Sequence, residues 1–110
     1  MSAQPQEPFK RISVEEAKQL VDAGTPVIDV REPNEYQAGH IPGAKLVPLN
    51  SFLRSPKQHL PQGGTVLFVC AVGQRSAVAS EMAAAAGAVD VRNIEGGTNG
   101  WVAKGYPTER

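Results

Sequence analysis

The residues best suited to chemistry lie in one short stretch, Cys70-Ala-Val-Gly-Gln-Arg75-Ser76. Cys70 is the only cysteine of the chain. A cysteine reacts as a thiolate, whereas an isolated thiol has a pKa of about 8.5 and is mostly protonated at neutral pH. Arg75 brings a permanent positive charge, Ser76 a hydroxyl donor, and Gly73 the backbone freedom that a tight curl of amides needs. We expect these groups to lower the pKa of Cys70 and to hold an oxyanion or an anionic sulfur on the attacking atom.

The elements on either side of this stretch place Cys70 at the tip of a strand. Residues 65–69 are apolar and largely β-branched, which predicts a buried parallel strand. The alanine-rich residues 76–86, which a glycine follows, predict a helix that begins near Arg75 or Ser76. Cys70 would then lie on a loop that follows the carboxyl end of a parallel strand, and open α/β sheets bind ligands at such loops. The alternative, a buried structural cysteine, is less favoured because Cys70 comes at the end of the strand rather than inside it.

The totals describe one globular domain without net charge. Its 110 residues suffice for one core, and 11 basic residues balance 11 acidic ones. This balance indicates neither a nucleic acid nor a membrane surface as partner, and no apolar run reaches transmembrane length. The polar start lacks the layout of a signal peptide, so we expect a cytoplasmic protein with a flexible tail over 1–8 and a single domain over 9–110. One cysteine forms no internal disulfide, so any group that Cys70 accepts must leave to another molecule.

Segments typical of strands and helices alternate along the chain. We expect strands at 9–12, 26–30, 45–47, 65–69 and 89–94. Helices are expected after a capping box at Ser13 and Glu16, from Pro33 to Gly39, from Asn50 as a cap through Arg54, over 76–86, and as a last turn from Trp101 to Lys104. Residues 55–64 are expected to form a polar connection. Alternation on short connections predicts an α/β fold with a parallel sheet and helices on both faces.

Three separated segments of the chain together form a specific pattern. They are Asp29-Val-Arg-Glu…Glu35-Tyr…Gly39-His-Ile-Pro-Gly-Ala44, the Cys70-x-x-Gly-x-Arg-Ser76 loop, and Glu95-Gly-Gly97…Gly100-Trp101…Gly105-Tyr-Pro107. Their order and spacing resemble the rhodanese-like sulfurtransferase family over about residues 12–107. The resemblance implies a rhodanese-like fold, with a central, mostly parallel five-stranded sheet flanked by helices on both faces. It also implies that Cys70 is a catalytic cysteine that cycles through a persulfide.

The length of the cysteine loop separates two chemistries found on this fold. Related phosphatases and arsenate reductases look similar but carry one more residue between the cysteine and the arginine. Four residues separate Cys70 from Arg75, and a smaller loop suits a single sulfur atom better than a tetrahedral phosphate. The candidate substrate-binding residues are those that follow the cysteine: Ala71, Val72, Gly73, Gln74, Arg75 and Ser76.

The expected reaction is a double displacement on Cys70. Its thiolate attacks the outer sulfur of a donor such as thiosulfate, sulfite leaves, and cyanide, a small thiol or a protein cysteine then takes the sulfur. No cofactor is expected. Because Arg75 is the only cation of the loop, a persulfide or a protein-bound donor stays open beside thiosulfate. A sulfur-carrier module with little turnover of its own is an alternative, and so is a regulatory domain, although regulatory members of the family usually lack the cysteine.

A second set of polar residues resembles a catalytic group: Asp29, Arg31, Glu35 and His40. The resemblance favours a supporting role for them, as a buried or half-buried polar network between the strand and the following turn. A metal site is not expected, because one cysteine and two distant histidines, His40 and His59, lack the spacing of ligands. We expect His59 on the surface, and Trp101 and Tyr106 in or over the core.

Overall fold

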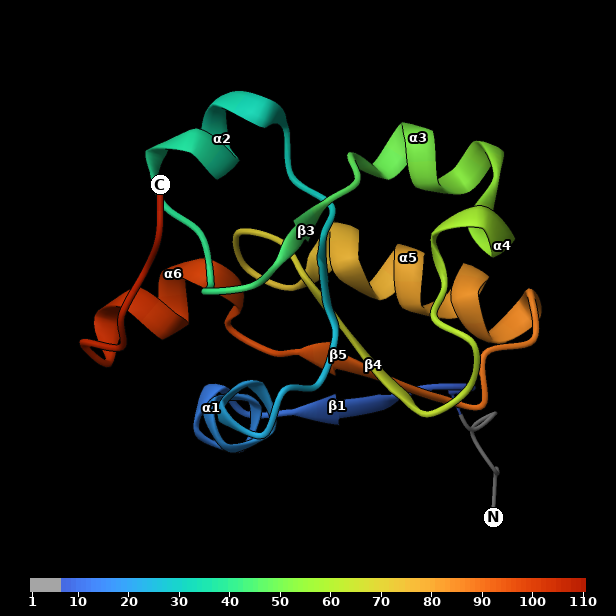
Figure 1. Cartoon of the computed structure of the whole chain (residues 1–110), viewed down its shortest axis with the longest axis horizontal. Helices are drawn as coiled ribbons and strands as arrows, with labels where there is room; N and C mark the ends of the chain where they lie inside the picture. Colours follow the sequence, from blue (N-terminus) through green and yellow to red (C-terminus); the bar gives the residue numbers. More distant parts are fainter. Residues whose placement is uncertain (1–6) are drawn as a thin grey trace, which may run out of the picture.

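The chain folds around one central sheet, seen in a computed structural model that describes residues 7–110 (Figure 1). Its strands are β1 (Lys10–Ile12), β2 (Val27–Asp29), β3 (Lys45–Leu46), β4 (Thr65–Val69) and β5 (Asp90–Ile94). They pair in the order β1-β5-β4-β2-β3, and every pair is parallel. The expected five-stranded α/β fold is therefore confirmed. The tail predicted over 1–8 falls mainly on residues 1–6, which lie outside the described residues.

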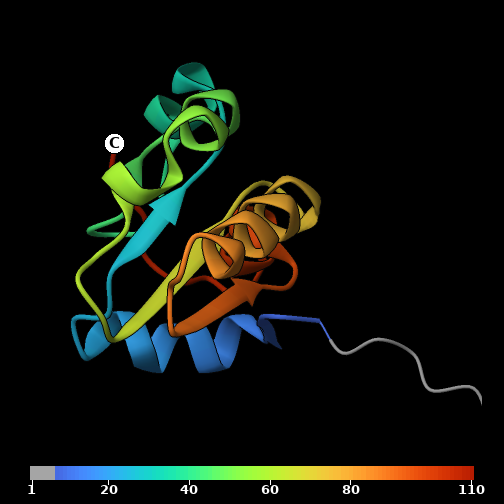
Figure 2. The ribbon, with the colours of Figure 1, turned by 90° about the vertical axis from the view of Figure 1, so that its right-hand side faces the viewer.

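Helices cover both faces of the sheet. They are α1 (Val14–Asp22), α2 (Pro33–Ala38), α3 (Leu49–Arg54), α4 (Pro56–His59), α5 (Gln74–Ala85) and α6 (Gly97–Ala103). Alternate residues of β4 belong to different cores, because successive side chains of a strand point to opposite faces. Val66 and Phe68 share a core with α3 and α5, whereas Leu67 and Val69 share one with α1 and α6. Figure 2 shows α1 and α5 on opposite sides of the strands. Within residues 7–110, no helix is both long and apolar enough to cross a membrane.

Three helices differ from their sequence prediction. α4 lies within 55–64, where the sequence predicts only a polar connection; Pro56 at its first position presets the backbone for a helical turn. α3 follows Pro48, so Asn50 lies inside the helix instead of capping it. α6 begins at Gly97 rather than at Trp101. Its first residues have low helix propensity, and the burial of Thr98 and Trp101 against the sheet outweighs that preference.

The aromatic residues of the C-terminal segment pack as the sequence predicts. Trp101 is fully buried, and its indole N–H donates to the carbonyl oxygen of Pro107 at 2.7 Å. The Tyr106 ring meets the Trp101 ring edge-on, with 5.1 Å between their centroids. The prediction for His59 is wrong: α4 carries this half-buried side chain against Phe52, with 6.2 Å between ring centroids, and its Nδ1 is buried.

Candidate active site

Cys70 lies directly after β4, at the carboxyl end of a central strand of the sheet. The loop that follows is short, because α5 already begins at Gln74, before the predicted start at Arg75 or Ser76. Gly73 caps this helix in the left-handed conformation, with φ of 110°. Only glycine adopts such angles without steric cost, and the turn at Gly73 folds the backbone amides back over the cysteine.

Hydrogen-bond donors converge on the sulfur of Cys70. The amide of Gly73 donates to Sγ at 3.1 Å, and the hydroxyl of Ser76 donates to it at 3.3 Å. Burial raises the pKa of the Cys70 thiol, but the hydroxyl of Ser76 and the amides of Ser76, Gly73 and Val72 outweigh it, so the pKa lies below its ordinary value. Cys70 is 1% exposed, as a structural cysteine would be, yet donors aimed at its sulfur favour the thiolate.

The carbonyl groups of the loop point the other way, toward β5 and α6. The carbonyl of Cys70 accepts from the amide of Thr98 at 2.8 Å, and that of Ala71 accepts from the amide of Asn99 at 3.1 Å. The carbonyl of Gly73 accepts from the side-chain Nδ2 of Asn93 at 3.1 Å. Because these three carbonyls form hydrogen bonds on the far side of the loop, the loop amides face the sulfur.

Arg75 is paired with Glu35 of α2. Arg75 Nη1 lies 2.8 Å from Glu35 Oε1, and Nη2 lies 3.0 Å from Oε2, a bidentate geometry. The Arg75 guanidinium lowers the pKa of the Glu35 carboxyl to about 2. The hydrogen bonds to Glu35 raise the pKa of Arg75, and the charge of Cys70 adds to this effect. Of the four residues predicted to form a polar network between β2 and the following turn, Glu35 is therefore the one that pairs with Arg75.

Asp29 and Arg31 form a buried ion pair at the end of β2. Arg31 Nη2 lies 2.9 Å from Asp29 Oδ2 and also donates to the carbonyl of Gly39 at 2.9 Å. His40 is buried too, stacks on the ring of Tyr36 with 3.6 Å between centroids, and places Nδ1 2.9 Å from the Tyr36 carbonyl oxygen. Arg31 thus links Gly39, at the carboxyl end of α2, to Asp29 of β2, whereas His40 contacts α2 itself. The supporting role of the three residues remains a prediction.

Comparisons with known proteins identify the family. A family model described as "Rhodanese-like domain" matches residues 13–104. The chain belongs to the rhodanese-like domain family. Thiosulfate sulfurtransferase GlpE of Pseudoalteromonas translucida is 34% identical over 99 residues, which are 86% of this chain and 90% of the relative. GlpE of Pseudomonas entomophila is 38% identical over 104 residues, covering 92% and 91%. The crystal structure of a rhodanese-related protein from Thermoplasma volcanium superposes with a TM-score of 0.82 at 32% identity, covering 92% of this chain and 98% of the other.

The residues of this rhodanese-like domain that contact the Cys70 loop from β5 and α6 are not among the predicted site residues. Asn93 lies on β5, far from Cys70 in sequence, and carries no local signal of its role. Gly97 did carry a signal, because paired glycines after a strand indicate a close backbone approach. A Cβ at Gly97 would lie 2.5 Å from the carbonyl oxygen of Ala71 and 2.6 Å from that of Cys70.

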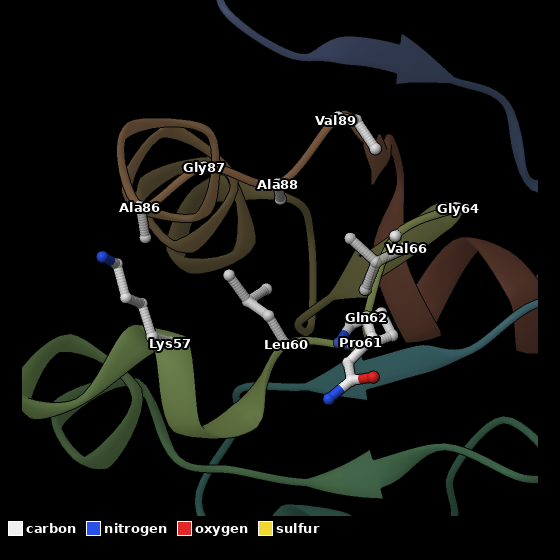
Figure 3. A pocket seen from close by; sticks show the side chains of 11 residues that line it. Lys57, Leu60, Pro61, Gln62, Gly64, Val66, Ala86, Gly87, Ala88 and Val89 are labelled. Carbon is white, nitrogen blue, oxygen red and sulfur yellow. The ribbon is translucent and has the colours of Figure 1, made fainter.

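The largely apolar cavity shown in Figure 3 lies away from this loop. It has a volume of about 240 Å³ and is bounded by Lys57, Leu60 and Val66 and by the turn after α5. Val66 lies near the amino end of β4, whereas Cys70 follows the carboxyl end of the same strand. Among residues 7–110 we find no cluster of three or more histidine, cysteine, aspartate or glutamate side chains that could hold a metal ion.

Proposed function

We propose that this rhodanese-like domain is a sulfurtransferase that moves a sulfane sulfur through a persulfide on Cys70. The observation that carries the proposal is the pair of hydrogen bonds from Gly73 and Ser76 to the sulfur, which favour a thiolate in spite of burial. The names of the two GlpE relatives support the reaction class. Four residues between Cys70 and Arg75 give a loop better sized for sulfur than for phosphate.

The reaction consists of two displacements at sulfur. The Cys70 thiolate attacks the outer sulfur of the donor, the S–S bond of the donor breaks, and its electron pair leaves with sulfite when the donor is thiosulfate. The new persulfide keeps one negative charge, which the amides of Val72, Gly73 and Ser76 and the Ser76 hydroxyl are placed to stabilise. An acceptor nucleophile then attacks the outer sulfur, and the Cys70 thiolate leaves. Cyanide becomes thiocyanate, and a small thiol or a protein cysteine becomes a persulfide.

Turnover with thiosulfate and cyanide tests the proposal. We expect the wild-type protein to form thiocyanate, and the Cys70→Ser variant to lose more than about a thousandfold of that rate, as expected when a covalent nucleophile is removed. Ser80→Ala is a matched control, because Ser80 is buried on the next turn of α5 and donates to a backbone carbonyl instead of the sulfur. Full turnover in Cys70→Ser would contradict the proposal. Sulfur on Cys70 without cyanide-dependent turnover would support the carrier alternative.

A further inference from the structure

We infer that Glu35 sets the charge of the donor that this site accepts: by binding both Nη atoms of Arg75 it keeps the only cation of the loop paired, which favours a monoanionic persulfide over the thiosulfate dianion. This inference rests on the proposed sulfurtransferase function. It makes Glu35 a positioning residue that acts on the donor through Arg75.

The Glu35–Arg75 pair lies at the edge of the site, where a donor must arrive. The side chains of Arg75 and Glu35 are 36% and 30% exposed, whereas Cys70 is 1% exposed. Arg75 lies close enough to Cys70 for the charge of the cysteine to contribute to its raised pKa. A donor that reaches the sulfur therefore meets the ion pair, and an anionic group on it competes with the Glu35 carboxylate for the guanidinium.

A hydrogen bond within α2 fixes the position of the Glu35 side chain that pairs with Arg75. Its Oε1 accepts from the backbone amide of Glu32 at 3.0 Å, within the capping box that begins α2. The buried pair of Asp29 and Arg31 fixes the chain just before this helix. A donor that displaces Glu35 from Arg75 must therefore also strain a helix cap.

Among residues 7–110, no cation in the other ion pairs near the loop is free of a carboxylate. Arg31 is paired with Asp29. Arg11 is shared between Glu7 and Glu95, and Oε2 of Glu95 also accepts from Asn93 beneath the loop at 2.6 Å. The residues between Cys70 and Arg75 are uncharged. Amides and a hydroxyl stabilise the single negative charge of a thiolate or persulfide, but a dianion gains little without a free cation.

Both donors react with Cys70 in the same balanced step. With a persulfide R–S–S⁻, the Cys70 thiolate attacks the outer sulfur, the S–S bond breaks, and R–S⁻ leaves with the electron pair, so one persulfide anion replaces another. With thiosulfate, the same attack releases sulfite with both of its negative charges. The donors therefore differ in the negative charge that they bring to the edge of the site. Glu35 disfavours the donor with the larger negative charge because it keeps Arg75 paired.

The ratio of kcat/KM for thiosulfate to kcat/KM for cysteine persulfide tests the inference. A ratio is used because any effect of the substitution on Cys70 reactivity cancels between donors. We expect Glu35→Gln to raise this ratio about tenfold, equivalent to about 1.4 kcal/mol, because no carboxylate then compensates the charge of Arg75. A glutamine oxygen can still accept from the Glu32 amide, so the helix cap should survive, which urea unfolding checks.

Asp22→Asn serves as the matched control. It also removes one negative charge from an ion pair, that of Lys18 and Asp22 on α1, and should leave the ratio unchanged. The inference is overturned if Glu35→Gln leaves the ratio at its wild-type value, or if Asp22→Asn raises it equally. If neither donor places sulfur on wild-type Cys70, the proposed function fails, and the inference fails with it. Sulfur on Cys70 with an unmoved ratio overturns the inference alone.

Discussion

Asn93 donates a hydrogen bond of 3.1 Å to the carbonyl oxygen of Gly73, from beneath the loop that carries Cys70. The amide of Gly73 in turn donates to the Cys70 sulfur at 3.1 Å. Asn93 is fully buried, and its Nδ2 also meets Glu95 Oε2 at 2.6 Å; both partners are acceptors, which fixes the orientation of the side-chain amide. One side chain of β5 thus orients the glycine that stabilises the thiolate.

We predict that Asn93→Ala raises the pKa of Cys70 and slows its alkylation near neutral pH. The substitution removes one of two donors to the Gly73 carbonyl, which keeps its 3.2 Å bond from the Ala77 amide, and should lower the free energy of unfolding by about 1 kcal/mol. The pH dependence of the alkylation rate measures the pKa, and urea unfolding measures the stability. Asn99→Ala, at an exposed side chain of α6, is the control and should change neither. An unchanged alkylation profile in Asn93→Ala would show that Gly73 needs no such support.

Ser76 and Ser80 allow the contribution of one hydroxyl to be isolated. Both are fully buried on α5, but only Ser76 Oγ donates to the sulfur, whereas Ser80 Oγ donates to the Ser76 carbonyl oxygen at 2.7 Å. Hydrogen bonds to charged groups contribute about 1.5–3 kcal/mol, so we expect Ser76→Ala to slow alkylation about tenfold or more at a pH below the thiol pKa. Ser80→Ala should alkylate at the wild-type rate. Equal slowing of alkylation in both variants would mean that altered packing of α5, not the lost hydrogen bond to the sulfur, causes the effect.

Substitutions at Gly97 and Gly105 distinguish a glycine required for close backbone packing from one required only for its positive φ. Both have positive φ, 60° and 77°, but a Cβ at Gly105 has no atom within 4 Å, whereas one at Gly97 meets the carbonyls of Ala71 and Cys70. We expect Gly105→Ala to cost about 1–2 kcal/mol of stability, and Gly97→Ala about 3 kcal/mol or more with loss of sulfur loading. Urea unfolding and intact mass measure the two effects. Similar losses of stability in both variants would rule out the close approach of α6 to the loop.

The Glu35–Arg75 pair should make the free energy of unfolding depend on pH under acidic conditions. The pKa of Glu35 falls from its ordinary value of 4.5 to about 2 on folding. The pair therefore stabilises the fold fully above pH 4.5, and this contribution is lost as the pH falls toward 2. We predict that the difference in unfolding free energy between wild type and Glu35→Gln is constant at neutral pH and shrinks over that window. A difference that does not vary with pH would argue against the pair in solution.

Local signals in the sequence are enough to predict the strand, loop and helix that carry Cys70. The apolar run of β4, the glycine at position 73 and the alanine-rich α5 act over short distances, so strand, loop and helix could be predicted without the sheet order. The capping serine at position 13 was predictable for the same reason, and its hydroxyl does accept from the Glu16 amide at 3.1 Å.

Long-range contacts could not be predicted from the sequence. Glu35 and Arg75 are 40 residues apart, and Asn93 and Gly73 are 20 apart, so only the parallel order of β2, β4 and β5 brings them together. The early start of α6 has the same origin. Its first residue is a glycine because α6 approaches the backbone of the Cys70 loop, a requirement that helix propensity does not contain.

The mass of the intact protein after incubation with a sulfur donor tests the central claim most directly. Wild-type protein treated with thiosulfate or with cysteine persulfide should gain the mass of one sulfur atom, and cyanide should remove it. Cys70→Ser, treated in the same way, should gain nothing while unfolding in urea as the wild type does. No added sulfur on the wild type with either donor, or the same added sulfur on Cys70→Ser, would contradict a persulfide on Cys70.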